Sequence, residues 1–61
     1  MKYVAAFHSA VVRNFKQMYK EAYGREPLWL TDEEIWDISD EGSRAGDTDE
    51  DILLEMKDRE E

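Results

Sequence analysis

The spacing of three aspartates suggests a site that could bind a metal ion. They occupy alternating positions, Asp47, Asp49 and Asp51. An EF-hand calcium loop begins in this way, with alternating carboxylates that converge on one hard cation. The same loop needs glycine at its sixth position and a bidentate glutamate at its twelfth, and these positions hold Ile52 and Asp58. We therefore interpret the segment as an acidic helix start and predict no metal site. A weak binder that responds to divalent metal is the alternative.

His8 is the only histidine and the second candidate for chemistry. A general base needs an orienting partner and a substrate proton within reach, and the neighbouring sequence offers neither. At helical spacing His8 falls beside Val12 and Phe15, so we interpret it as a packing residue at the edge of a core. The chain has no cysteine, and it carries no phosphate-binding loop, nucleophile elbow or zinc-protease motif. We predict that the protein is not an enzyme and uses no cofactor.

A long amphipathic helix is predicted for residues 2–23. Apolar side chains recur every three to four residues and cover about 200° of the helix, so we expect it to have neighbours on two sides. Gly24 is expected to end this helix, because glycine adopts the left-handed conformation without a steric cost. The apolar positions are Tyr3, Val4, Phe7, Ala10, Val11, Val12, Phe15, Met18, Tyr19 and Ala22. Opposite them lies a basic stripe of Lys2, Arg13, Lys16 and Lys20.

A second helix is predicted for residues 32–41, after a connector that contains Pro27. Thr31 and Glu34 have the spacing of a capping box, in which each side chain bonds the other residue's backbone N–H. The expected end is Gly42, followed by a turn. The predicted inward residues are Ile35, Trp36 and Ile38.

A third helix is predicted for residues 49–59, where Thr48 repeats the capping threonine. Its inward residues are expected to be Ile52, Leu53 and Met56. The predicted fold class is therefore all-α, a single small three-helix domain over residues 1–61. A chain of this length buries a marginal core and has no disulfide to support it, so helix packing, self-association or a partner must stabilise it.

The charge of the chain is strongly divided. Residues 1–24 carry four bases and one acid, whereas residues 25–61 carry fifteen acids and four bases, and the net charge is -8. A chain this acidic repels nucleic-acid phosphates and anionic lipids. We therefore expect no direct contact with nucleic acid or membrane. We predict a protein partner with a basic surface. The basic stripe is expected to pair internally or with a second copy.

The predicted partner-binding surface combines a tryptophan with the acids of the second and third helices. Trp29 lies in the connector and is expected to be partly exposed, whereas Trp36 is expected to lie in the core. The alternative interpretation is a solvated face that keeps a small protein soluble. The predicted binding residues are Trp29, Asp32, Glu33, Asp37, Asp40, Glu41, Asp47, Asp49 and Glu50.

The function predicted from these features is that of a non-catalytic acidic binding module. In size and charge alone the chain resembles the small regulators and inhibitors carried by phages and other mobile elements, some of which mimic nucleic acid. The alternative is a small homo-oligomeric structural or assembly subunit, and unused apolar surface leaves a homodimer open. No apolar stretch approaches the ~20 residues of a membrane span, and the first residues do not complete a signal peptide. We expect a cytoplasmic protein.

Overall fold

The computed structural model describes the backbone of residues 2–60 and the side chains of residues 7–60. Within this range the chain forms three helices, α1 (Lys2–Tyr23), α2 (Asp32–Arg44) and α3 (Asp49–Asp58). The predicted all-α fold, with one long helix and two short ones, is confirmed. The side chains of Lys2, Tyr3 and Val4, which we assigned to the basic stripe and the apolar arc, lie outside the described residues.

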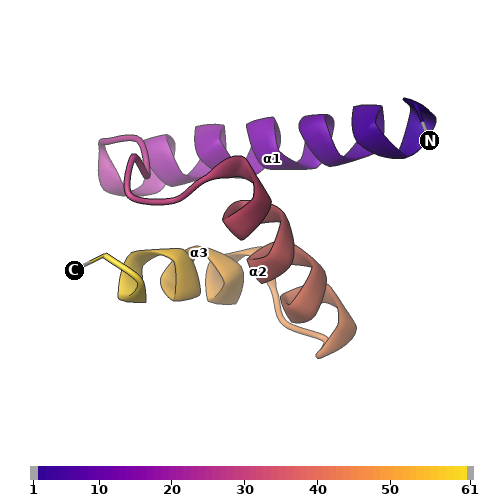
Figure 1. The fold of residues 1–61 in the computed structure, drawn as a ribbon. Helices are drawn as coiled ribbons and strands as arrows, with labels where there is room; N and C mark the ends of the chain where they lie inside the picture. The colour runs from indigo at the N-terminus through magenta and orange to yellow at the C-terminus, as the bar shows by residue number, and fades with distance from the viewer. Residues whose placement is uncertain (1, 61) are drawn as a thin grey trace.

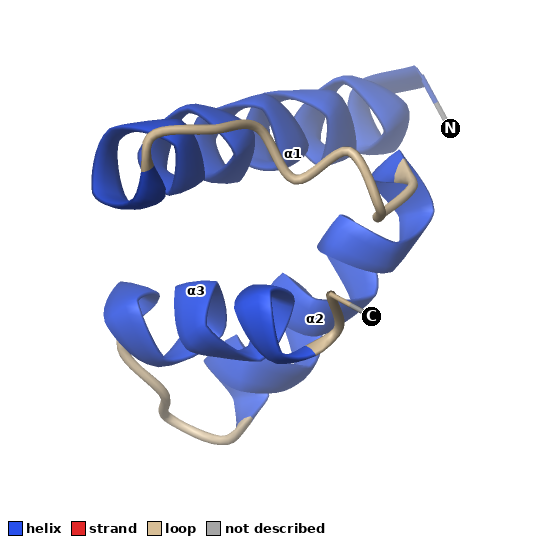
Figure 2. Ribbon diagram, turned by 90° about the vertical axis from the view of Figure 1, so that its left-hand side faces the viewer, coloured by secondary structure: helices blue, strands red, loops and turns tan. Residues whose placement is uncertain are grey.

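Both short helices pack on the same side of α1 (Figures 1 and 2). α2 runs away from α1, and α3 then returns so that α1 and α3 point in the same direction (Figure 1). Every pair of helices is in contact. The C-terminal ends of α1 and α3 therefore lie together at one end of the molecule, and α2 contacts α1 nearer to the other end.

The core lies where the three helices meet. α1 contributes Val12, Phe15 and Tyr19, and α1 has two helical neighbours, as its broad apolar arc predicted. Only part of this apolar arc is buried, however, because Phe7 is 61% exposed and Ala10 and Ala22 are also exposed. The remaining core residues come from the connector and the short helices: Leu30, Ile35, Ile38, Ile52, Leu53 and Met56.

Glycine ends α1, as predicted. Gly24 has a φ of 81°, and its N–H donates to the Lys20 carbonyl at 2.7 Å. The connector then folds back over the core, where Pro27 and Leu30 are buried. The connector is thus a packed segment whose course sets the start of α2.

Both short helices begin with a complete capping box. In α2 the Glu34 N–H donates to Thr31 Oγ1 at 3.2 Å and the Thr31 N–H donates to Glu34 Oε1 at 2.8 Å. In α3 the Asp51 N–H donates to Thr48 Oγ1 at 3.2 Å, and Asp51 Oδ2 accepts from the Thr48 N–H at 3.3 Å. These bonds satisfy N–H groups that a helix start otherwise leaves without a partner.

The predicted end of α2 at Gly42 is wrong, because α2 continues to Arg44. Gly42 is buried within the helix, and a Cβ atom added there would lie 2.6 Å from Ile52 Cγ1 of α3. This glycine therefore permits close packing of two helices. The left-handed residue that follows the helix is Gly46, with a φ of 81°. It belongs to a Schellman motif, in which the Asp47 N–H donates to the Gly42 carbonyl at 2.8 Å.

α3 is one residue shorter than predicted. It ends at Asp58, and Arg59 forms its C-cap. The three residues predicted to face inward, Ile52, Leu53 and Met56, are all buried.

Candidate functional site

An open groove lies between the N-terminal half of α1 and the first half of α2. Its volume is about 510 Å³. α1 supplies His8, Ser9 and Val12 to its lining, and α2 supplies Trp36 with three acids, Asp32, Glu33 and Asp37. The groove thus combines aromatic and apolar surface with carboxylates, although the tryptophan that we predicted for the binding surface is Trp29 and the one in the groove is Trp36.

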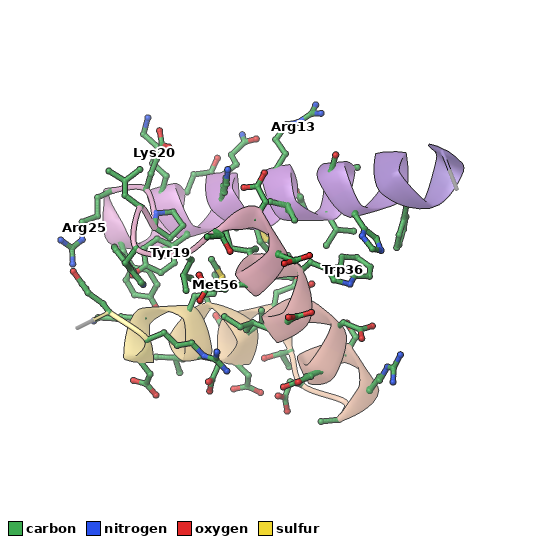
Figure 3. The ribbon with its side chains drawn as sticks, in the orientation of Figure 1. Arg13, Tyr19, Lys20, Arg25, Trp36 and Met56 are labelled. Carbon is green, nitrogen blue, oxygen red and sulfur yellow. The ribbon has the colours of Figure 1, made fainter. Side chains whose placement is uncertain are left out.

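Trp36 forms the aromatic wall of this groove together with residues of α1. Its indole stacks on the imidazole of His8, with 3.7 Å between ring centroids and 25° between ring planes. The ring of Phe7 meets it edge-on at 5.8 Å. Figure 3 shows Trp36 beside α1, at the end of the molecule opposite Arg25. His8 is thus a packing residue at the edge of the core, as predicted.

The prediction that Trp36 lies in the core is wrong in one respect, because its side chain is half-buried at the margin of the core. The reason lies in helix geometry. At about 100° per residue, Trp36 projects roughly 100° from Ile35 and 160° from Ile38, which are the residues that define the buried face.

The three carboxylates of the groove differ in their charge environment. Asp32 is paired with Lys16 of α1, with 2.7 Å between Oδ1 and Nζ. Glu33 and Asp37 are exposed, and neither forms an ion pair with any of the other side chains described here. They stand four residues apart, which places them on the same side of α2. The groove therefore has one neutralised carboxylate and two uncompensated ones.

The basic stripe is only partly used inside the molecule. Lys16 pairs with Asp32, which agrees with the expected internal pairing. Arg13 and Lys20 point away from α2 and α3 (Figure 3), and within residues 7–60 neither forms an ion pair. The oxygen-tipped side chains of α3 extend on the opposite side of the molecule (Figure 3). Arg13 and Lys20 thus lie on the side of the molecule opposite the acids of α3.

The other predicted acids lie in separate places. Asp40 pairs with Arg44 at 3.4 Å within α2. Glu41 and Asp47 line a hollow of about 260 Å³ between α2 and α3. Asp49 and Glu50 are exposed in the first turn of α3. The structure therefore brings Asp32, Glu33 and Asp37 together beside Trp36, and it distributes the rest over two further regions.

Trp29 lies at the other end of the core. Its Nε1–H donates to the Met56 carbonyl at 3.1 Å, near the end of α3. Its ring meets Tyr19 edge-on at 5.5 Å, and the guanidinium of Arg25 lies 5.2 Å from the ring centroid. Trp29 is partly exposed, as predicted, but its polar group bonds within the molecule.

Charged groups surround this end of the core. Arg25 pairs with Glu60, and the ammonium of Lys57 lies 5.0 Å from the ring centroid of Tyr23. Burial raises the pKa of Tyr19 above its usual value of 10.0, and the charge of Glu60 adds to this effect. Both causes disfavour the phenolate.

The aspartates that resemble the start of a calcium loop do not form a ligand set. In the part of the chain that the structure describes, no group of three or more His, Cys, Asp or Glu side chains is arranged to hold a metal ion. The carboxylate of Asp51 instead accepts the Thr48 N–H of its own capping box. Of the three helices in residues 2–60, none is long and apolar enough to cross a membrane.

Comparison of the chain with protein families, curated proteins and solved structures finds no match. The candidate site therefore depends on geometry alone. We predicted Asp32, Glu33 and Asp37 as site residues but did not predict that His8, Ser9 and Trp36 lie beside them. The position of Trp36 on the wheel of α2, away from both isoleucines, is the signal that could have placed it at the site.

Proposed function

We propose that this protein is a non-catalytic binding module of the cytoplasm that docks its acidic α2 surface onto a basic surface of a partner protein. Its size and charge suit a small regulator or inhibitor of the kind carried by phages and other mobile elements. An acidic surface of this kind can occupy a nucleic-acid-binding site of the partner by imitating the charge of phosphates.

The observation that carries this proposal is the outward face of α2. Glu33, Asp37 and Glu41 are exposed at spacings of four residues, and Asp40 lies beside them. Arg44 is the only base in α2. Carboxylates arranged along one helix raise the rate of encounter with a basic protein and favour it over acidic competitors. The half-buried Trp36 beside them supplies the aromatic contact that binding surfaces often use.

Charge reversal on this face tests the proposal. In the variant Asp37→Lys/Asp40→Lys/Glu41→Lys, the immobilised protein is expected to lose the partner that the native protein captures from a host lysate in a salt-sensitive fraction. The control Glu21→Lys/Glu26→Lys/Asp58→Lys makes the same change in net charge at exposed positions outside α2. It is expected to retain the partner. Equal capture by both variants would show that α2 is not the docking surface.

A second candidate function, a homo-oligomeric assembly subunit, is favoured by the apolar side chains left on the surface. Phe7, Leu28 and Leu54 are 61%, 85% and 52% exposed, respectively. Single exposed apolar residues are ordinary, so only their use in contacts between copies would give them this role. Sedimentation equilibrium over a hundredfold range of concentration decides the matter. A mass that stays at 7.2 kDa would eliminate this candidate.

A further inference from the structure

We infer that the groove between α1 and α2 binds an arginine side chain of the partner protein, held between Trp36 and the carboxylates of Glu33 and Asp37. This inference rests on the proposed function, since it names the chemical group through which a basic partner is recognised. Three properties of the groove support this inference: its uncompensated charge, its aromatic wall and its apolar floor.

The charge of the groove selects a cation. Glu33 and Asp37 line it, and neither forms an ion pair within residues 7–60. Residues four apart on a helix have Cβ atoms about 5–6 Å apart. A guanidinium carries five N–H donors in a planar fork, so a single arginine can donate to both carboxylates. An anionic ligand would be repelled, and an apolar one would remove these carboxylates from water without a partner.

The charge pairing that already exists at the groove supports the same choice. Lys16 reaches from α1 to Asp32, so one cation of this chain already pairs with an acid of the lining. Glu33 and Asp37 have no such cation within residues 7–60, so their exposed carboxylates remain available to a cation from another protein.

The aromatic wall favours arginine over lysine. Trp36 is half-buried, so part of its indole remains accessible, and His8 holds it in place by stacking at 3.7 Å. A guanidinium is planar and weakly hydrated, so it stacks on an indole more readily than a lysine ammonium does. Val12 lines the groove but is only 4% exposed, so it offers the methylene groups of an arginine a small apolar contact.

A titration with short blocked peptides tests this inference. The probes are acetyl-Gly-Arg-Gly-amide, its lysine counterpart and its citrulline counterpart, which keeps the shape of arginine but has no charge. The readout is the NMR signals of the Trp36 indole N–H and the His8 ring, with Trp36→Phe used for assignment. The arginine peptide is expected to give saturable shifts at both residues, the lysine peptide weaker ones and the citrulline peptide none. Equal shifts with all three peptides would overturn the inference.

Paired neutral variants locate the binding site. Glu33→Gln/Asp37→Asn is expected to raise the dissociation constant of the arginine peptide roughly fivefold, since two exposed charge contacts are lost. The control Glu21→Gln/Asp58→Asn changes the net charge equally at exposed positions outside the groove and is expected to leave binding unchanged. Circular dichroism confirms that both variants are folded. An equal loss in both variants would mean that the peptide responds to overall charge, and the groove assignment would then be wrong.

The failure of this inference is distinguishable from the failure of the proposed function. If the arginine peptide leaves Trp36 and His8 unaffected while charge reversal on α2 still abolishes partner capture, the groove is not the arginine site but α2 remains the docking surface. If partner capture also survives charge reversal, both proposals are wrong. If the peptide shifts both residues and the paired variants behave as expected, the inference stands.

Discussion

The two tryptophans lie in opposite regions of the molecule, and their surroundings differ in kind. Trp29 is held by the Met56 carbonyl, Tyr19 and Arg25, all within the chain. Trp36 is stacked on His8, but it borders an open groove beside carboxylates that have no cation within residues 7–60. We call the first region the closed end and the second region the open groove.

The difference indicates how a small chain divides its large side chains between stability and recognition. At the closed end, the polar group of the indole and the nearby charges find partners inside the protein. At the open groove, the carboxylates of Glu33 and Asp37 and part of the Trp36 indole remain available to solvent. A protein of this size has a small margin of stability, so we expect the closed end to carry most of the folding energy and the open groove most of the binding.

The largest expected effect is on stability, from truncation of Trp29. Trp29→Ala removes a hydrogen bond and the edge contact with Tyr19, so we expect it to lower the free energy of unfolding by about 3 kcal/mol. Trp36→Ala is expected to lower the free energy of unfolding by about 1 kcal/mol. The effect is smaller because the Trp36 ring lies at the margin of the core and buries less apolar surface. Urea unfolding followed by circular dichroism measures both. Equal losses would show that the two regions do not differ in this respect.

A smaller effect is expected from the caps that start the two short helices. Thr31→Ala and Thr48→Ala should each lower the free energy of unfolding by about 1 kcal/mol, since each removes an N-cap bond. They should differ in binding. Only Thr31 fixes the first turn of α2, which carries Asp32 and Glu33 into the groove, so only Thr31→Ala should weaken binding of the arginine peptide. Equal weakening by the Thr48 variant would mean that the groove depends on the whole fold.

Part of the pH dependence of stability in the alkaline range should come from the closed end. Because the pKa of Tyr19 is raised by burial, the folded protein holds this proton more tightly than the unfolded chain does. The resulting stability is complete below the usual value near pH 10 and is lost as the pH rises through the pKa of the folded state. Urea unfolding between pH 9 and 11.5 should show this decline, and Tyr19→Phe should reduce it. An unchanged profile in Tyr19→Phe would contradict this assignment.

The helices could be predicted from sequence because their signals are local. Thr31 with Glu34, and Gly24 after a long periodic segment, act within one turn of the backbone, so the start of α2 and the end of α1 were placed correctly. Gly42 also follows a predicted helical segment, which is the sequence pattern of a helix end. It lies inside α2 instead, where it permits close contact with Ile52 of α3. Such a contact between helices is absent from local sequence.

The candidate site was predicted less completely for the same reason. The acids of α2 were recognised from composition, but their separation into paired and unpaired members depends on Lys16, which comes from another helix. Likewise, the use of Trp29 inside the fold depends on a carbonyl twenty-seven residues away. Sequence periodicity places a residue on a face of its own helix, and tertiary packing then determines which neighbour it meets.

The smallest effects on stability should come from the exposed ion pairs, one in each region. Lys16→Met removes the pair with Asp32, and Arg25→Met removes the pair with Glu60. Each is expected to change the free energy of unfolding by no more than about 1 kcal/mol, because exposed pairs gain little. Their effect on binding should differ. Lys16→Met leaves a third uncompensated carboxylate in the groove, so the arginine peptide should bind about twofold more tightly.

Arg25→Met is the matched control, since it removes one positive charge at the closed end. It should leave peptide binding unchanged apart from a small effect of net charge, which decreases as salt is added. The difference between the two variants therefore measures the local charge of the groove directly. Identical tightening in both variants would show that the peptide senses only the net charge of the protein, and the distinction between the open groove and the closed end would then not extend to binding.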